Sequence, residues 1–233
     1  MFARSLLTLP AVLLALTAGA APAPTPAPPA PPPVLQNVAL PKPDLIGRMT
    51  LERALAMRRS VREYAPTPLT LREVSQILWA AHGITGPEGK RTTPSARAVY
   101  PLQVWLVAND VTGLAPGIYC YSPADHALEL VAAGDHRAAI AAAASGQKAV
   151  EQASAVVAVV GDSVLAAEKF HGRATAWLAM EAGFVVQNVY LEATATSLGT
   201  VMVGGFQDAA ARQALGLPAK MVPLGFMPLG WRK

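Results

Sequence analysis

The segment Arg58–Tyr64 reads Arg-Arg-Ser-Val-Arg-Glu-Tyr and places three arginines within five positions. A guanidinium stays charged at any working pH and is costly to bury without an anionic partner, so these side chains favour an anion. Ser60 adds a hydroxyl, and the backbone N–H groups of the segment are further donors for a phosphate. Taken alone, such a run is more often a solvated basic patch, so the remainder of the chain decides between the two interpretations.

Length and composition indicate a globular protein. The chain has 233 residues, enough for one domain behind a leader, and 52% of them are hydrophobic, enough for a sizeable core. The net charge of +4 is mild, and no Lys/Arg run is interleaved with aromatics, so nucleic-acid binding is not expected. Cys120 is the single cysteine and cannot form an internal disulfide, and no Cys/His cluster has metal-ligand spacing, so no metal is expected.

The N-terminus is typical of an exported protein. Residues 1–20 combine a positive residue, the apolar run Leu6–Leu16 and the small-residue cleavage site Ala18–Ala20, which predicts a signal peptide. The apolar run is shorter than the roughly 20 residues that span a bilayer, so no stable membrane anchor is expected after cleavage. Residues 21–39 are rich in Ala and Pro and predict an extended linker. We therefore expect a folded domain at 40–233, in the periplasm or secreted.

Capping signals and apolar periodicity predict two helices around the arginines. Thr50 is placed to cap a helix that runs through Met57 and leads into the basic segment. Thr70–Glu73 reads as a capping box for an amphipathic helix that Gly83 ends. Further on, two prolines bracket small residues in Pro94–Pro101, which keeps the backbone stiff and open to a flat ligand.

The second half of the chain alternates short strands with helices. The predicted strands are 103–108, 117–121, 128–131, 155–160, 199–206 and 221–229, and the predicted helices are 136–144, 173–198 and 208–215. Short β-type runs separated by turn residues favour antiparallel pairing. The helix at 173–198 is apolar over most of its circumference, which predicts burial nearly all round. It keeps a narrow polar stripe of Glu181, Asn188 and Glu192, and we expect loops or a subunit interface to satisfy that stripe rather than catalysis to use it.

Several motifs follow one another along the chain: RRSVREY, LTLREVSQILWAAHGITG, PSARAVYPLQVW, GIYCYSP, MEAGFVVQNVYLEATATSLGT, VGGF, LGLP and PLGFMPLG. This order resembles the nitroreductase family over about residues 40–230, and more closely its SagB-type, azoline-oxidising branch. The resemblance implies an α+β fold in which helices flank a mainly antiparallel central sheet and one long helix is buried at the centre. It also implies an intertwined homodimer that binds FMN non-covalently at the dimer interface.

The resemblance assigns roles to the basic segment. Arg58 and Arg59 correspond to residues that hold the FMN phosphate and ribityl end, and Ser60 to a further hydrogen-bond partner. Arg62 corresponds to a residue near N1 and the C2 carbonyl of the flavin ring, where negative charge develops on reduction. A fixed guanidinium there stabilises that charge, so Arg62 is the residue given a catalytic role.

The remaining cofactor-binding residues are likewise implied by the resemblance. They are Pro94, Ser95 and Ala96, which line the ring from the other subunit, Gly204 and Gly205, whose backbone runs near N5, and Arg232, which closes the phosphate site. Two positions depart from the branch. Arg97 stands where relatives tend to have Gly, so either its φ is negative or it adds a cation to the pocket. Phe184 replaces a more usual His.

The function implied is that of an FMN-dependent oxidoreductase. It passes two electrons to or from a small organic substrate, of nitroaromatic or quinone type, in a ping-pong cycle. A peptide-heterocycle oxidase and a non-catalytic flavin-binding protein remain as alternatives, because no acid/base dyad or nucleophile triad is present. NAD(P)H is the donor implied by the family, and it stays open because an exported protein meets little of it.

Overall fold

A computed structural model describes residues 37–233 of the chain. The predicted signal peptide and most of the predicted linker lie outside the described residues. Asn37–Ala39 forms strand β1, which pairs antiparallel with β6 (Ala127–Ala133). The folded part therefore includes the last three residues of the predicted linker.

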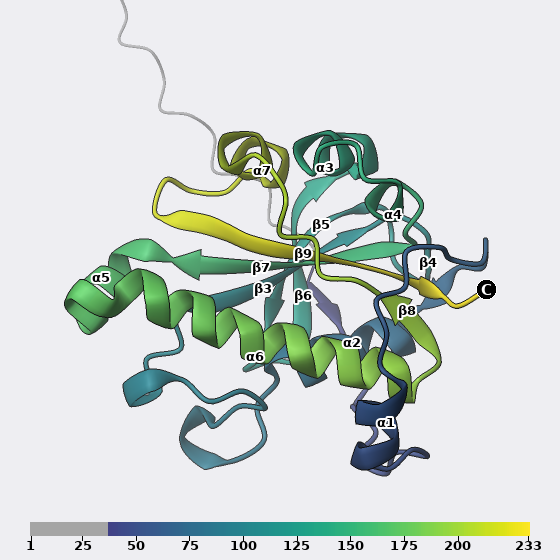
Figure 1. The fold of residues 1–233 in the computed structure, drawn as a ribbon, viewed down its shortest axis with the longest axis horizontal. Coiled ribbons are helices and arrows are strands. Elements are labelled where there is room, and N and C mark those ends of the chain that lie inside the picture. Colours follow the sequence, from purple (N-terminus) through teal and green to yellow (C-terminus); the bar gives the residue numbers. More distant parts are fainter. Residues whose placement is uncertain (1–36) are drawn as a thin grey trace, which may run out of the picture. The chain divides into compact units, whose positions relative to one another are not determined.

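A seven-stranded sheet forms the centre of the fold, and every neighbouring pair in it is antiparallel (Figure 1). Its order is β1-β6-β5-β3-β7-β9-β8. The strands not yet given are β3 (Leu102–Ala108), β5 (Gly117–Ser122), β7 (Ala155–Asp162), β8 (Leu198–Thr200) and β9 (Met221–Trp231). A separate parallel pair joins β2 (Leu69–Thr70) to β4 (Val111–Thr112). Both short strands and β1 went unpredicted.

Helices cover both faces of the sheet (Figure 1). On one face lie α2 (Leu71–His82), α5 (Ser163–Phe170) and α6 (Ala174–Ala195), and on the other lie α3 (Arg137–Ala143), α4 (Lys148–Glu151) and α7 (Asp208–Leu215). Each layer packs its apolar side on the sheet, so β7 is buried along its whole length. This arrangement confirms the predicted α+β fold with its mainly antiparallel sheet and long helix.

The predicted helix starts rest on caps that the structure contains. The Thr50 side chain accepts a hydrogen bond from Arg53 N–H at the start of α1 (Leu51–Met57). At α2, Thr70 and Glu73 form the reciprocal capping box, and Gly83 is the C-cap. Because these caps satisfy N–H groups that the helix itself leaves unpaired, they fix where both helices begin.

The long helix and the strand after it differ from the prediction. The α6 helix ends at Ala195, because Thr196 bonds back to Glu192 and Ser197 adopts a left-handed φ of 64° that turns the chain into β8. The strand predicted for 199–206 is wrong beyond Thr200. Met202 N donates to a tyrosine hydroxyl on α6 instead of to a strand, and Val203 keeps a single bridge to Phe226.

The predicted all-round burial of the long helix is also wrong for a single chain. One side of α6 is exposed, and there Met180 keeps 56% and Phe184 40% of its surface. The opposite side packs on the sheet and on α2 through buried residues such as Leu178, Val185 and Val189. The helix is apolar on both sides, but one chain covers only one of them.

Within residues 37–233, no helix is long and apolar enough to cross a membrane.

Candidate functional site

One cluster of predicted site residues gathers at the C-terminal half of α6, beside α1 (Figure 1). The Arg58 guanidinium lies over the Tyr190 ring, 4.9 Å from its centroid. The Tyr190 hydroxyl accepts a hydrogen bond from Met202 N at 2.7 Å and lies 3.1 Å from Ser60 Oγ. A single phenol on α6 therefore joins the arginine segment to the chain that leads into the glycine pair.

Arg232 reaches the same part of α6 from the end of β9. Its Nε donates to Leu198 O at 2.9 Å and its Nη2 to Thr194 Oγ1 at 3.2 Å, while its backbone bridges to Tyr64. Thr194 lies one helical turn after Tyr190 and donates to the Tyr190 carbonyl at 2.8 Å. These contacts hold Arg232 in place despite its position one residue before the chain end.

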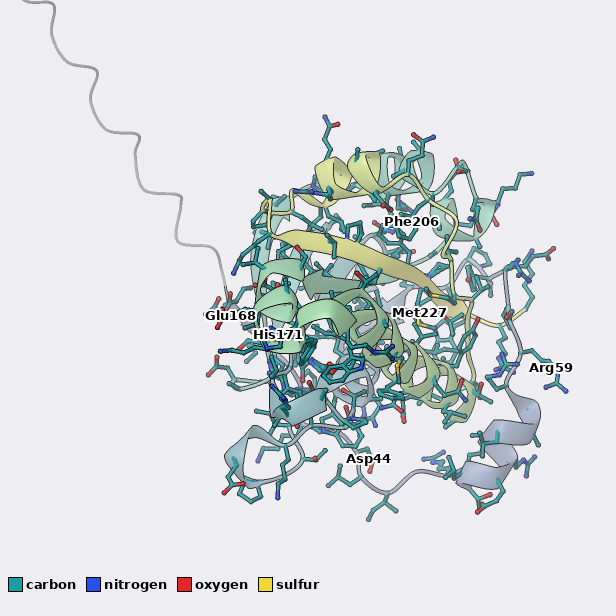
Figure 2. All side chains as sticks on the ribbon, turned by 60° about the vertical axis from the view of Figure 1, so that its left-hand side comes forward. Asp44, Arg59, Glu168, His171, Phe206 and Met227 are labelled. Atoms are coloured by element: carbon teal, nitrogen blue, oxygen red, sulfur yellow. The ribbon has the colours of Figure 1, made fainter. Side chains whose placement is uncertain are left out.

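Arg59 and Arg62 are held less firmly. Arg59 lies at the outer edge of the molecule just after α1, and its Nη1 donates to Ala56 O and Arg58 O (Figure 2). Arg62 is exposed and close to Tyr64, where its charge opposes the burial that raises the pKa of the Tyr64 phenol. Within the described part of the chain, none of Arg58, Arg59, Arg62 and Arg232 forms an ion pair with a carboxylate. Their charges are therefore available to an anion.

The glycine pair is exposed on the chain between β8 and α7. A Cβ built on Gly204 would meet Met202 Cε at 3.9 Å, and one built on Gly205 would meet Gln147 Nε2 at 4.0 Å. Both distances are ordinary van der Waals contacts, so the protein alone does not require glycine at either position. A requirement for glycine would come from a ligand that approaches the backbone closely.

The Pro94–Ala96 segment docks on a different part of α6. Ser95 Oγ and Ala96 N both donate to Glu181 Oε1, at 3.1 and 2.9 Å. Glu181 precedes Tyr190 by nine residues, which is about 13 Å along a helix. Within one chain, the structure therefore does not bring Pro94–Ala96 to Arg58, Ser60, Tyr190 and Arg232, the arginine cluster.

A hollow of about 350 Å³ opens beside this segment. It is lined by Pro94, Ser95, Ala96, Trp177, Met180, Glu181 and Phe184. Most of these side chains are apolar, and two are aromatic. The hollow therefore suits a flat, largely apolar group.

The loop that carries Pro94–Ala96 is anchored behind the hollow. His82 Nδ1 lies 2.8 Å from Thr93 Oγ1, and the Arg91 guanidinium lies over the Tyr100 ring at 4.7 Å. Burial, together with the charge of Arg91, lowers the pKa of His82 to about 3. His82 is therefore neutral at ordinary pH, which suits its buried position.

The backbone conformation of Arg97 decides one of the two alternatives that the sequence left open for this residue. Its φ is +55°, so a negative φ at this position is wrong, and Ala98 and Tyr100 are left-handed as well. A non-glycine residue in this region is strained. The Arg97 guanidinium donates to Lys169 O at the end of α5, at 3.4 Å, and the residue does not line the hollow.

Loops satisfy much of the predicted polar stripe. Asn188 Nδ2 donates to Ala80 O and Thr92 O, at 3.0 and 3.3 Å, and Glu181 Oε1 is paired as described above. Glu192 is half-buried, and burial raises the pKa of its carboxyl. The expectation that loops satisfy the stripe is thus confirmed for one oxygen of Glu181, while Asn188 bonds to a loop at Thr92 and to α2 at Ala80.

Two α6 residues that contact the arginines were not recognised as site residues in the sequence. Tyr190 and Thr194 lie on the predicted long helix at a spacing of four, which places them on the same side of it. That spacing was the available signal, but a tyrosine among valines and leucines is more often part of the core. No group of three or more His, Cys, Asp or Glu residues that could hold a metal occurs in the described residues.

Comparison with known proteins identifies the family to which this chain belongs. A protein-family model described as "Nitroreductase family" matches residues 55–231 of this chain. A protein of Methanocaldococcus jannaschii named "Putative nitroreductase MJ1384" is 41% identical over 185 residues, which are 79% of this chain and 92% of that protein.

Solved structures share the fold. A crystal structure of a "putative nitroreductase" from Ralstonia eutropha JMP134 is 29% identical, has a TM-score of 0.75, and covers 88% of this chain and 93% of its own. The NADPH:FMN oxidoreductase from Vibrio harveyi complexed with NAD+ has a TM-score of 0.57 at 20% identity, covering 78% of this chain and 69% of its own. The fold, the family match over most of the domain and the 41% identical relative lead to one conclusion: the chain belongs to the nitroreductase family of oxidoreductases.

Proposed function

We propose that the protein is an FMN-dependent oxidoreductase that passes two electrons to or from a small organic substrate in a ping-pong cycle. The observation that carries this proposal is the arginine cluster beside α6 (Arg58, Ser60, Tyr190 and Arg232), whose cations pair with no carboxylate within residues 37–233. Family membership and the similarity to a solved NADPH:FMN oxidoreductase support it.

The residues present fit a flavin phosphate. The Arg58 guanidinium lies over the Tyr190 ring and its nitrogens make no hydrogen bond within the described residues, so they can donate to a phosphate, and Ser60 offers a hydroxyl beside it. Arg232 adds a second anchored cation. When bound, FMN would supply the two-electron chemistry, which no side chain of this protein provides. In this proposal Arg62 stabilises the charge that develops on reduction, and the backbone of Gly204 and Gly205 lies along the ring.

A second copy of the chain would complete the site. The exposed side of α6 displays Met180 and Phe184. Residues 45–57, which include α1, add five large apolar side chains that are each at least 41% exposed: Leu45, Ile46, Leu51, Leu55 and Met57. Such a concentration of large apolar side chains on one chain is typical of an interface. We infer a homodimer in which Pro94–Ala96 of one subunit meets the arginine cluster of the other, since one chain keeps these parts separate.

The substrate class follows from the hollow. Its aromatic and apolar lining favours a flat acceptor such as a nitroaromatic or a quinone, and NAD(P)H is the proposed donor. Membership of the SagB-type branch is also part of the proposal and rests on the order of motifs in the sequence. It carries the alternative of a peptide-heterocycle oxidase. Export through a leader at residues 1–20 is proposed as well, and N-terminal sequencing of the mature protein would then start near Ala21.

Anaerobic reduction tests the proposed function. NADH or NADPH added to the flavin-loaded protein should bleach the flavin absorbance, and a quinone or nitroaromatic should restore it over repeated cycles. A flavin spectrum without turnover would favour a binding protein. Turnover only with a heterocycle-bearing peptide would favour the oxidase.

A further inference from the structure

We propose that Glu181 donates a proton to the acceptor substrate in the hollow and is thus a second catalytic residue beside Arg62. This inference rests on the proposed function, because it concerns the acceptor of the same reaction. Glu181 lies on α6, keeps 4% of its surface exposed and lines the hollow. It is the one side chain among the lining residues that titrates between acidic and neutral pH.

The two carboxylate oxygens of Glu181 have different surroundings. Oε1 accepts hydrogen bonds from Ser95 Oγ and Ala96 N, while Oε2 has no hydrogen-bond partner among the described residues. Oε2 is not fully enclosed by protein atoms. Oε1 therefore fixes the carboxyl against the loop, and Oε2 of this hollow-lining side chain is not used by any hydrogen bond within the described residues.

The reaction requires such a group. A hydride delivers two electrons and one proton to the acceptor, so an oxygen on that acceptor needs a second proton to give a neutral product. In the proposed step the O–H bond of the Glu181 carboxyl breaks and an O–H bond on the substrate forms, leaving Glu181 as a carboxylate. The Ser95 and Ala96 donors stabilise this carboxylate, and solvent returns the proton before the next cycle.

The surroundings of Glu181 suit a carboxyl that changes protonation. Burial raises its pKa, and the hydrogen bonds from Ala96 and Ser95 oppose this shift. The groups that shift the pKa are all uncharged. On the loop the charged neighbour is Arg97, whose guanidinium turns to Lys169 O, and on α6 the residues one turn away, Trp177, Leu178, Phe184 and Val185, are neutral. No cation thus holds Glu181 permanently ionised.

The test compares Glu181→Gln with Ser95→Ala and with a matched control, Glu192→Gln. The glutamine keeps an oxygen to accept the Ser95 and Ala96 hydrogen bonds but cannot donate an acidic proton. Glu192 is a second carboxyl on α6, half-buried and outside the hollow. Stopped-flow experiments would measure the reductive half-reaction with NADPH and the oxidative half-reaction with a quinone separately, alongside FMN affinity and midpoint potential.

For Glu181→Gln we expect FMN affinity, midpoint potential and the reductive rate to stay within about threefold of wild type. The oxidative rate should fall by roughly 100- to 10,000-fold, the usual share of general acid catalysis, and lose its pH dependence. In Ser95→Ala the carboxylate loses a stabilising donor, so its pKa rises. Because the protonated form is active, the fall in oxidative rate with rising pH should then occur at higher pH. Glu192→Gln should match wild type.

A measurement that does not depend on turnover completes the test. Infrared difference spectra of the protein over the acidic to neutral range should contain a protonated-carboxyl band that is lost in Glu181→Gln and retained in Glu192→Gln. If Glu181→Gln keeps the wild-type oxidative rate and pH profile, or loses no such band, Glu181 only holds the loop and the inference is overturned. FMN binding by the wild-type protein is measured before any variant is made. A wild-type protein that binds no FMN would contradict the proposed function rather than the role of Glu181.

Discussion

At the scale of single residues, the arginines of the basic segment differ in how the fold holds them. Arg58 stacks on Tyr190, whereas Arg59 lies at the outer edge and Arg62 is exposed beside Tyr64. The sequence predicted an anion-binding role for all of them because it contains only their charge and spacing. Which of them points to a common place depends on α6, which is more than 100 residues further along the chain.

Arg58 and Arg62 should fail in different ways when each is replaced by alanine. Arg58→Ala removes a charge-assisted contact to the phosphate, worth roughly 1.5–3 kcal/mol, so FMN affinity should fall by about one to two powers of ten with little change in midpoint potential. Arg62→Ala should make the bound flavin harder to reduce and slow the reductive half-reaction at saturating FMN. Flavin titrations and potentiometry of both variants check this. Equal losses of affinity with unchanged potentials would show that both arginines are only a phosphate clamp.

Tyr190 should matter for cofactor binding through its hydroxyl. Tyr190→Phe leaves Met202 N without its acceptor and Ser60 without its partner, which should cost roughly 1–3 kcal/mol and weaken FMN binding by about tenfold. Tyr119→Phe is the control, because Tyr119 lies on β5 and its hydroxyl donates to Ala115 O in the turn before that strand, away from the cluster. Calorimetry should find both variants destabilised, and flavin titration should find weaker binding in Tyr190→Phe alone. Normal FMN affinity in Tyr190→Phe would refute the role assigned to the phenol.

A substitution at Gly204 can show whether glycine is needed there for FMN binding or for folding. Since a Cβ at this position meets nothing closer than 3.9 Å, Gly204→Ala should fold with wild-type stability but bind FMN more weakly. Gly172→Ala, where a Cβ would meet nothing within 4 Å, is the matched control and should change neither property. Thermal unfolding with and without FMN measures both effects. An unchanged response of Gly204→Ala to FMN would place the flavin elsewhere.

At the scale of elements, prediction succeeded where the determining interactions are local. The Thr50 cap predicted the start of α1, and the capping box and Gly83 predicted the start and the end of α2, because the partners of each cap lie within four residues of each other. The strand predicted for 199–206 failed because Met202 N bonds to Tyr190, a tertiary contact that β-propensity does not contain. The apolar composition of residues 173–198 predicted the long helix. It did not predict which side of that helix stays exposed in a single chain.

The exposed side of α6 should be a dimer interface. Phe184→Lys places a charge on that side and should convert the dimer to monomer, with loss of bound FMN. Val164→Lys on α5 is the control, because Val164 is an exposed apolar residue, at 59% against 40% for Phe184, but does not lie on this side of α6. Light scattering with absorbance detection measures mass and flavin together. A Phe184→Lys monomer that retains FMN would contradict a site shared between subunits.

At the scale of the whole molecule, the order of motifs predicted the family and the fold, and both are confirmed. The candidate site was predictable only as a set of residues. Arg58, Ser60 and Arg232 converge on α6, while Pro94–Ala96 lies about 13 Å away along the same helix in one chain. Sequence patterns do not say how two copies of a chain pack against each other. They therefore could not predict how Pro94–Ala96 of one subunit meets the arginine cluster of the other.

The central claim is that this family member holds FMN, and the flavin itself tests it. The protein should be denatured after purification or reconstitution, and the released chromophore identified and quantified against the chain. The account predicts FMN at one molecule per chain, with twice the chain mass before denaturation. Release of FAD, or no flavin after reconstitution with FMN, would contradict it.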